Sequence, residues 1–443
     1  MRQMFCLITL LSMTSLSAAG DEIELERLKL ARMAVEARLK TGDLLRDRGD
    51  IEGALREYRE AALILNAALG RRPIRRARPT PPRVIRKPVA SPPVLLPRPL
   101  PAKQVAAAVT QGLVWLSKHQ DESGRWDCDE FAKHDPQFDK CDGLGATLYD
   151  VGVSGLSVLA FLKAGHTDLD NPFSTNVRRG LNFLIESQDE EGCFGARSSQ
   201  HFIYNSVLAC WAMVEAFRLT KNPAYGKCAQ RGVDFILKSR NPYLAWRYEP
   251  RGGENDTSVT AWCVQVLKAA DAAGLKGDPD AYEGARMWID KMTDAEFGQV
   301  GYSMPGGSSA RMEGMQDKFP PQKTQAMTAA GILTRIACGE NPRTNAAIQK
   351  GSNLCMERPP VWNPNDGSID MYYWYFGTRA MAAVGGESWQ RWKLYIQDAA
   401  VRHQHQKGSG AREWSWDPIG AWGTEGGRVY ATAIMTLTLQ ASR

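Results

Sequence analysis

The sequence predicts an all-α protein whose main domain is a helical repeat spanning residues 103–443. A short skeleton of glycine, aromatic, aliphatic and glutamine positions recurs along this region. Apolar helix-like runs alternate with its copies, and the period-two alternation of strands is scarce. A helical repeat unit cannot bury its apolar face alone, so we expect the copies to stack around one shared core.

The skeleton is clearest in two early copies with identical internal spacing. The first is Gly112, Trp115, Leu116, Gln120, Gly124 and Trp126; the second is Gly180, Phe183, Leu184, Gln188, Gly192 and Phe194. Later copies are looser: Gly232, Phe235, Ile236 and Trp246 with Arg240 in place of glutamine, then copies around Gly284 and Gly351, and a last one with Gln406, Gly410 and Trp414. We expect each glutamine to satisfy free backbone groups at a helix end and each glycine to permit a tight turn, which are structural roles.

Six apolar runs separate these copies. They cover residues 151–162, 202–219, 259–270, 326–337, 371–384 and 429–439. Each has the length of a helix and is bounded by clusters of Gly, Pro, Asn and Asp. Six helical hairpins are therefore predicted.

The first residues resemble an export signal. Arg2 precedes an apolar run at 4–16, and small residues follow at 17–19. We predict a signal peptide over 1–19 and an exported protein, periplasmic or extracellular; an uncleaved membrane anchor is the alternative. No later stretch is apolar enough to suggest a transmembrane helix.

Residues 22–69 are charged and alanine-rich, with apolar residues at helical spacing. Small residues such as Gly42, Gly49 and Ala54, together with Tyr58, resemble a single tetratricopeptide repeat. A plain helical hairpin or coiled-coil segment is the alternative. One hairpin has too little core to be stable alone, so docking on a protein partner or self-association is expected.

Residues 70–102 alternate Pro with Arg and lack acidic residues. Such a segment favours extended polyproline II, so we predict a disordered linker and a domain boundary. The ten Lys and Arg at 71–103 exceed the net charge of +6, so the remainder of the chain is net acidic. The linker is either a solubilising spacer or a contact for an anionic surface; specific nucleic-acid binding is not expected.

The pattern from Arg179 to Phe194 is basic-Gly-x-x-aromatic-aliphatic-x3-Gln-x3-Gly-x-aromatic. It resembles the QW repeat of squalene and hopene cyclases and the related repeat of protein prenyltransferase β subunits. The stretches 370–378 and 427–433 look like those of exported, uncharacterised bacterial proteins with a prenyltransferase/squalene oxidase repeat. This resemblance covers 103–443 and implies an α/α toroid of about six helical hairpins around a central cavity.

The catalytic motifs of these enzymes are not matched. The stretch 253–257 corresponds to the Asp-x-Asp-Asp-Thr motif of hopene-type cyclases, but Asn255 stands where the proton donor is expected. Asp256 is retained as a weak catalytic candidate, and a shifted role for Glu254 stays open. Neither Asp127-Cys128 nor Cys263 has the Asp-x-Cys spacing of the prenyltransferase zinc site. We therefore predict no metal and no cofactor.

Eight cysteines remain once the signal, with Cys6, is removed. An exported protein meets oxidising conditions, so disulfides are possible. Two pairs close short loops and are the candidates, Cys128 with Cys141 and Cys338 with Cys355.

Polar residues cluster at the starts of the six apolar runs, which a toroid brings to one mouth. The candidates for ligand binding there are Asp256, Asp370, Tyr373, Arg428 and Tyr430. Converging helix starts favour an anionic or polar ligand, and tyrosines stack on sugar-like rings. The alternative is that these residues only cap helices and fill a plugged hole.

The sequence thus predicts an exported, non-catalytic binding or scaffolding protein. A terpenoid- or lipid-modifying enzyme with a degenerate acid motif is one alternative. A polysaccharide-active toroid enzyme is another, which needs two facing carboxylates. The candidates for such a pair are Asp256, Asp366, Asp370, Glu413 and Asp417.

Overall fold

The computed structural model describes residues 95–169, 171–199 and 201–443, with single residues or short pieces at 33–35, 37, 38, 40, 41, 45 and 57. The chain divides into two units, Met1–Val89 and Ala90–Arg443. In the first, Arg38 and Glu57 form an ion pair of 2.8 Å. The predicted signal lies outside the described residues, as do most of the predicted hairpin and linker.

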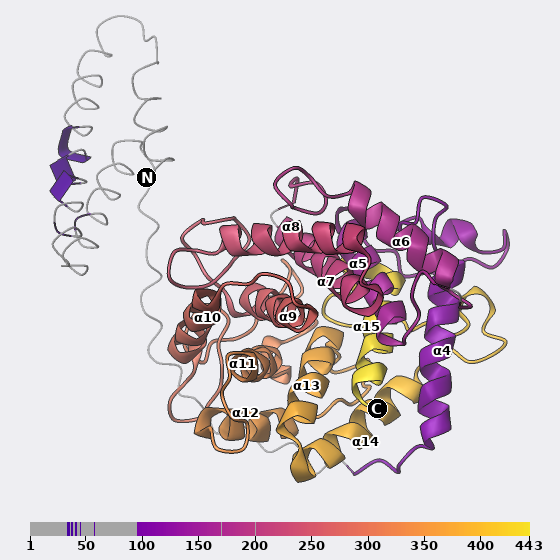
Figure 1. The fold of residues 1–443 in the computed structure, drawn as a ribbon. Helices are drawn as coiled ribbons and strands as arrows, with labels where there is room; N and C mark the ends of the chain where they lie inside the picture. Colours follow the sequence, from indigo (N-terminus) through magenta and orange to yellow (C-terminus); the bar gives the residue numbers. More distant parts are fainter. Residues whose placement is uncertain are drawn as a thin grey trace, which may run out of the picture. The chain divides into compact units, whose positions relative to one another are not determined.

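Twelve α-helices form the second unit, and they alternate between an outer and an inner ring (Figure 1). The outer helices are α4 (Ala102–Lys118), α6 (Ser174–Glu186), α8 (Pro223–Ser239), α10 (Pro279–Met292), α12 (Ala346–Met356) and α14 (Gly386–Arg402). The inner helices are α5 (Asp150–Lys163), α7 (Phe202–Thr220), α9 (Thr257–Ala273), α11 (Ala326–Ala337), α13 (Met371–Val384) and α15 (Gly423–Ala441). Each inner helix packs against the next, and α15 returns to α5. The predicted α/α toroid of six hairpins is confirmed.

The two rings differ in how they bury their side chains. The outer helix α6 buries only Val177, Gly180, Leu181 and Leu184, a stripe at helical spacing that faces inward. The inner helix α7 is buried around its whole circumference from Phe202 to Ala216. In the part of the chain that the structure describes, none of the helices is long and apolar enough to cross a membrane.

The repeated glutamines connect neighbouring hairpins. Gln120 Nε2 donates to the carbonyl of Gly124 (2.9 Å) in its own loop and to that of Asn176 (3.0 Å) on α6. Gln188 does the same with Gly192 (3.2 Å) and with Cys228 (3.0 Å) on α8. The amide thus donates to backbone carbonyls, as expected, and one of the two belongs to the next outer helix.

In the copies that have tryptophan at the last aromatic position, the indole donates to a carbonyl near the end of the preceding outer helix. Trp126 Nε1 donates to the carbonyl of Leu116 near the end of α4 (2.8 Å). Trp246 Nε1 donates in the same way to Ile236 on α8 (2.7 Å). The indole therefore hydrogen-bonds to the outer helix of its own hairpin, whereas the glutamine amide hydrogen-bonds to the next outer helix.

The loop glycines are required by close approach. Gly124 has φ +92°, and a Cβ there would lie 2.1 Å from the carbonyl oxygen of Arg179 on α6. Gly192 has φ +94° and faces Arg231 on α8 at 2.2 Å. Only glycine combines this backbone conformation with such contact.

The last copy of the skeleton lies two residues away from its predicted place. Gln404, not Gln406, is buried, and its Nε2 donates to the carbonyls of Trp414 (3.0 Å) and Ala108 (2.9 Å). Trp416, not Trp414, donates from Nε1 to Ala400 on α14 (2.7 Å). The loop is longer in this copy, which obscured the spacing. Since Ala108 belongs to α4, this glutamine closes the ring.

Replacing Gln404 by alanine tests the importance of ring closure. The buried Ala108 carbonyl and the partly buried Trp414 carbonyl would lose this donor, so the free energy of unfolding should fall by about 1–3 kcal/mol. Urea unfolding of the toroid followed by circular dichroism measures this change. Gln406→Ala is the matched control, because that side chain is exposed and donates within its own loop; its effect should stay within about 0.5 kcal/mol. Equal effects of the two substitutions would contradict the assignment.

Candidate functional site

A cavity of about 390 Å³ lies at the amino ends of the inner helices. Its wall includes residues from the first turns of all six inner helices and from the irregular segments before α9 and α11. The aromatic residues of this wall are Tyr149, His201, Tyr204, Tyr248, Trp262, Tyr302, Tyr372, Trp422 and Tyr430. The inner-helix starts thus meet at one mouth, as a toroid requires.

The phenol groups of the wall form short hydrogen-bonded chains. The Tyr204 hydroxyl donates to Ser258 Oγ (2.9 Å), which donates to the Tyr372 hydroxyl (3.0 Å). The hydroxyls of Tyr248 and Tyr302 lie 2.5 Å apart. Protein groups already cover part of these rings, since Tyr372 stacks on Phe376 and the Arg247 guanidinium lies over Tyr248. The remaining ring surface forms part of the cavity wall.

The charges of the wall disfavour an anionic ligand. Arg311 is the one permanent cation among the described lining residues, and it pairs with Asp370 at 3.0 Å, both side chains being 1% exposed. Its Nε and Nη1 also donate to the carbonyls of Phe319 and Ala310, each at 3.0 Å. Of the anionic or polar ligands that the sequence predicts, a polar one suits this wall better, because the guanidinium is already paired.

The remaining ionisable groups of the wall are acidic or neutral. Glu313 and Glu425 supply carboxylates. Burial lowers the pKa of His201, although Glu425 opposes the shift, so the imidazole is neutral at pH 7. The cavity is consequently an aromatic chamber with hydrogen-bond acceptors.

One donor of the wall has no partner. Trp422, the residue before α15, lines the cavity, and its buried Nε1 makes no hydrogen bond to any residue that the structure describes. A buried donor without an acceptor costs free energy. A ligand oxygen would remove that cost only if the atoms that cover this nitrogen moved aside, because the nitrogen is closed off from the cavity.

Asp256 lies behind this wall. Its side chain is fully buried, Oδ1 accepts from the Val259 amide at the start of α9 (2.8 Å), and Arg247 Nε is 3.8 Å from Oδ2. Burial raises the pKa of Asp256 to about 7, against the opposing effects of the Val259 amide, Arg247 and Tyr302. Tyr302 lines the cavity, whereas Asp256 does not.

The other residues of the stretch that matches the cyclase motif point elsewhere. Asn255 Oδ1 accepts from the Ala245 amide (3.0 Å) and from Asn241 Nδ2 (3.1 Å), so it holds a loop together. The side chain of Glu254 is 76% exposed and pairs with Arg247 at 2.9 Å. Neither residue lines the cavity.

The other four residues predicted to bind a ligand do not all lie at the cavity. Tyr430 lines the cavity. Asp370 accepts from the amide of Tyr373 (3.0 Å) at the start of α13 and reaches the wall only through Arg311. The Tyr373 hydroxyl donates to the carbonyl of Cys355 on α12 (3.1 Å), so it faces away from the cavity.

Arg428 connects the loop after α4 with the segment before α15. Its guanidinium donates to the carbonyl of Asp142 (2.9 Å) and pairs with Asp417 (2.8 Å), and the side chain is buried. Like Tyr373, it is absent from the described lining residues. Both contribute to folding through these contacts.

The carboxylates that line the cavity were missed by the sequence analysis. Of the predicted carboxylates, Asp366 accepts from the Ser368 amide, Glu413 accepts from Gly408, and Asp417 pairs with His405; these three, like Asp256 and Asp370, do not line the cavity. Glu313 lies in a long irregular segment, and Glu425 precedes the break in α15 at Gly427. Neither position has a periodic signal that could have identified it.

The predicted disulfides are not formed in the structure, where all four cysteines are free thiols. Cys128 lies against Asp150, whereas Cys141 lies against Asp135. Cys338 Sγ contacts the carbonyl of Tyr282, and Cys355 lies beside Tyr373. Closeness in sequence was misleading here, because the loops direct the members of each pair to different neighbours.

The raised pKa of Asp256 predicts a pH-dependent stability. Between the ordinary pKa of 3.8 and about 7, the folded chain keeps a proton that the unfolded chain releases. The free energy of unfolding therefore falls as pH rises through this window, by up to about 1.4 kcal/mol per pH unit, and the contribution is constant above it. Asp256→Asn keeps an acceptor for Val259 and should remove this slope.

Thermal unfolding of wild type and Asp256→Asn between pH 4 and 8 measures the effect. The difference in stability should shift in favour of the variant as pH rises. Asp278→Asn, at the equivalent cap of α10 but with a side chain 38% exposed, controls for replacing a capping carboxylate. A difference that stays constant with pH would show that Asp256 is ionised throughout.

No known protein-family model matches the sequence. Dammaradiene synthase of Dryopteris crassirhizoma is 24% identical over 196 residues, which are 38% of this chain and 28% of that protein. The chain thus matches little more than a quarter of that relative's length. Among solved structures, a D-mannose isomerase (TM-score 0.52, 11% identity, 77% of this chain and 98% of that one) is similar in fold.

Two further structures share this arrangement. An unsaturated glucuronyl hydrolase specific for heparin has a TM-score of 0.52 at 11% identity, covering 77% of this chain and 97% of that one. Cellobiose 2-epimerase from Bacillus thermoamylovorans has a TM-score of 0.50 at 14% identity, covering 76% and 99%. At these identities the likeness concerns the fold alone. Sequence and fold together agree with the expected resemblance to the terpenoid cyclase-like α/α-toroid proteins.

Proposed function

We propose that the protein is an exported binding protein whose toroid holds a neutral, ring-shaped molecule with hydroxyl groups. The observation that carries this proposal is the cavity, which has a volume of about 390 Å³ and a wall rich in aromatic side chains. Pockets of this size and composition suit small organic ligands. Export rests on the signal-like residues 1–19.

The polar groups of the wall favour hydroxyl groups on this ligand. The carboxylates of Glu313 and Glu425 offer acceptors, and Trp422 Nε1 would add a donor once a ligand displaces the atoms that cover it. Aromatic faces pack against the apolar face of a ring. An anionic ligand would meet these carboxylates while Arg311 is already paired with Asp370. A neutral ligand would not be repelled by the carboxylates and would not need a free cation.

Binding without turnover is supported by the positions of the acid groups that the sequence favoured. Asn255 cannot donate a proton as the cyclase acid does, and it is fixed in a loop. Asp256 and Asp370, which sequence favoured, lie behind the wall. The proposal therefore assigns the cavity to recognition.

Native mass spectrometry of the protein purified from its own host tests this proposal. A co-purifying neutral compound is expected, and its mass distinguishes a saccharide from a hydroxylated terpenoid. Tyr430→Ala, which shortens a side chain of the wall, should lose it. An anionic ligand, or the absence of any bound compound together with no response to either class in titrations, would overturn the proposal.

Trp422→Phe isolates the indole donor. The substitution keeps an aromatic ring but removes Nε1, so the affinity for the identified ligand should fall about three- to tenfold. Isothermal titration calorimetry measures the change. Trp389→Phe on the outer helix α14 is the matched control and should leave the affinity unchanged. An unchanged affinity for Trp422→Phe would exclude a hydrogen bond from this indole.

A second candidate function is a terpenoid- or lipid-modifying enzyme. It is favoured by Asp256, whose pKa of about 7 leaves the carboxyl partly protonated at neutral pH, and by the similarity to dammaradiene synthase. Tyr302 is the neighbour that connects Asp256 with the cavity. In this case the buried carboxyl would supply the proton that Asn255 cannot.

Turnover distinguishes the two functions. If the protein is such an enzyme, incubation with terpenoid alkenes should give a product with the wild type and none with Asp256→Asn, while the variant still binds the alkene. Product analysis by gas chromatography with mass spectrometry detects this. Binding of a ligand that both proteins return unchanged would exclude the enzyme and leave the binding function.

A further inference from the structure

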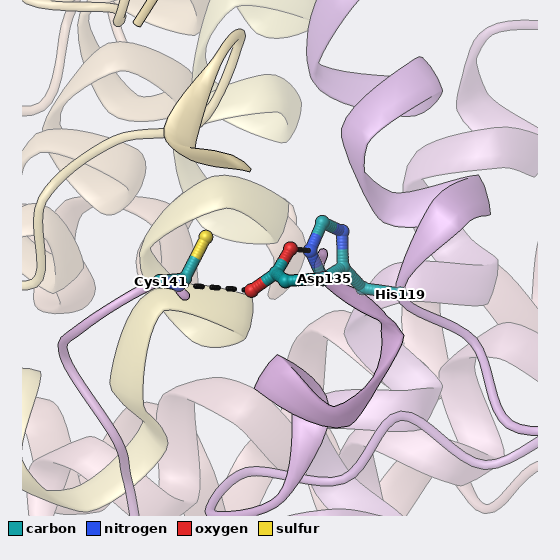
Figure 2. Close-up of side chains that lie close together, drawn as sticks. All are labelled: His119, Asp135 and Cys141. Carbon is teal, nitrogen blue, oxygen red and sulfur yellow. Dashed lines mark hydrogen bonds and ion pairs between the residues drawn. The ribbon is translucent and has the colours of Figure 1, made fainter. Parts of the chain in front are cut away.

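The loop that follows α4 brings three side chains of metal-binding types together. They are His119 at the end of α4, Asp135 after a short 3-10 helix, and Cys141. Their side chains converge in Figure 2, and one ligand atom from each lies within 4.8 Å of the others. All three residues are buried, with exposures of 3%, 8% and 5%.

We propose that His119, Asp135 and Cys141 bind a divalent transition-metal ion of the Zn²⁺ type. An imidazole nitrogen, a thiolate sulfur and a carboxylate oxygen are the ligands that zinc takes in proteins. The sulfur and nitrogen exclude Ca²⁺ and Mg²⁺, which prefer oxygen ligands. The proposal is independent of the ligand in the central cavity.

The imidazole is oriented as in known metal sites. His119 Nδ1 lies 2.8 Å from the carbonyl of Trp115, so it carries a proton and donates it. Nε2 is thereby directed at Asp135. The indole of Trp115 stacks on the imidazole, with centroids 3.9 Å apart, which fixes the ring plane. A backbone carbonyl holding the second nitrogen is the usual support of a zinc-bound histidine.

The carboxylate is held in a similar way. Asp135 Oδ2 accepts from the Cys141 amide (2.9 Å), while Oδ1 faces His119 Nε2 (2.8 Å). Ligand atoms around a tetrahedral zinc ion lie about 3.3–3.6 Å apart, as follows from bonds of about 2.0–2.3 Å. An ion would require the Asp135 to His119 contact to open by about half an ångström and the Cys141 sulfur, which lies within 4.8 Å of both, to reach the same spacing. A water molecule would complete four ligands.

Charge also fits. A dication balances the carboxylate of Asp135 and the thiolate of Cys141, so the buried site stays neutral. A neighbouring acidic group, Asp127, Asp129 and Asp150, differs in this respect because Arg125 already pairs with two of its members. The expectation that no metal is bound rested on the absence of the prenyltransferase ligand spacing and on the spacing of His403 and His405. The spacings here, sixteen and six residues, follow from the loop alone.

Metal binding by the full chain tests the proposal. After chelation and dialysis, titration with ZnCl₂ followed by elemental analysis should give one ion per chain. Titration with CoCl₂ should produce the near-ultraviolet absorption of a cobalt-thiolate bond. Absence of zinc uptake, or cobalt binding without thiolate absorption, would overturn the proposal and leave His119 and Asp135 as an ion pair only.

Variants locate the ion. Cys141→Ser and His119→Gln should each weaken Co²⁺ binding by at least about tenfold, and Cys141→Ser should abolish the thiolate absorption. Cys228→Ser and His166→Gln, at residues outside the cluster, are the matched controls and should bind as wild type. Unchanged cobalt absorption in Cys141→Ser would contradict the proposal. If either variant fails to fold, the stoichiometry and spectrum of the wild type still decide.

Discussion

The toroid depends on polar side chains that reach from the loop of one hairpin to the backbone of the next outer helix. Gln120, Gln188 and Gln404 make this contact through their amides, and Gln404 joins α14 to α4. Arg240 replaces glutamine in the third copy and still donates to the carbonyl of Asp280 on α10 (2.7 Å). What repeats is thus a donor of the right reach, so the sequence motif can degenerate without loss of the ring.

A closed ring fixes the starts of the inner helices around one axis, and this determines the electrostatics of the cavity. Asp256 and Asp370 occupy equivalent positions, and each caps its helix by accepting from the amide three residues on. Asp370 also has Arg311 at 3.0 Å, whereas Asp256 has only Arg247 at 3.8 Å. The same capping position therefore yields a neutralised ion pair in one hairpin and a carboxyl with a raised pKa in another.

Sequence could predict the periodic part of this molecule. The runs 326–337 and 371–384 coincide with α11 and α13, because buried inner helices are apolar over their whole length. Side-chain direction was less accessible: Tyr430 enters the cavity but Tyr373 turns toward α12. Residues on the irregular segments could not be predicted at all. Arg311 and Glu313, like the cluster of His119, Asp135 and Cys141, are brought into place by loops without any period.

The loop after α4 also positions part of the cavity. The Ala146 amide donates to the carbonyl of Glu425 (2.8 Å), and the Arg428 amide donates to Gly143 (2.8 Å). α15 breaks at Gly427, with φ 62°, where a Cβ would lie 2.5 Å from the amide nitrogen of Gly145. Glu425 and Tyr430, which line the cavity, flank this contact. Any ion that orders the loop through Asp135 and Cys141 would therefore also help to hold the segment that carries Glu425 and Tyr430 at the cavity.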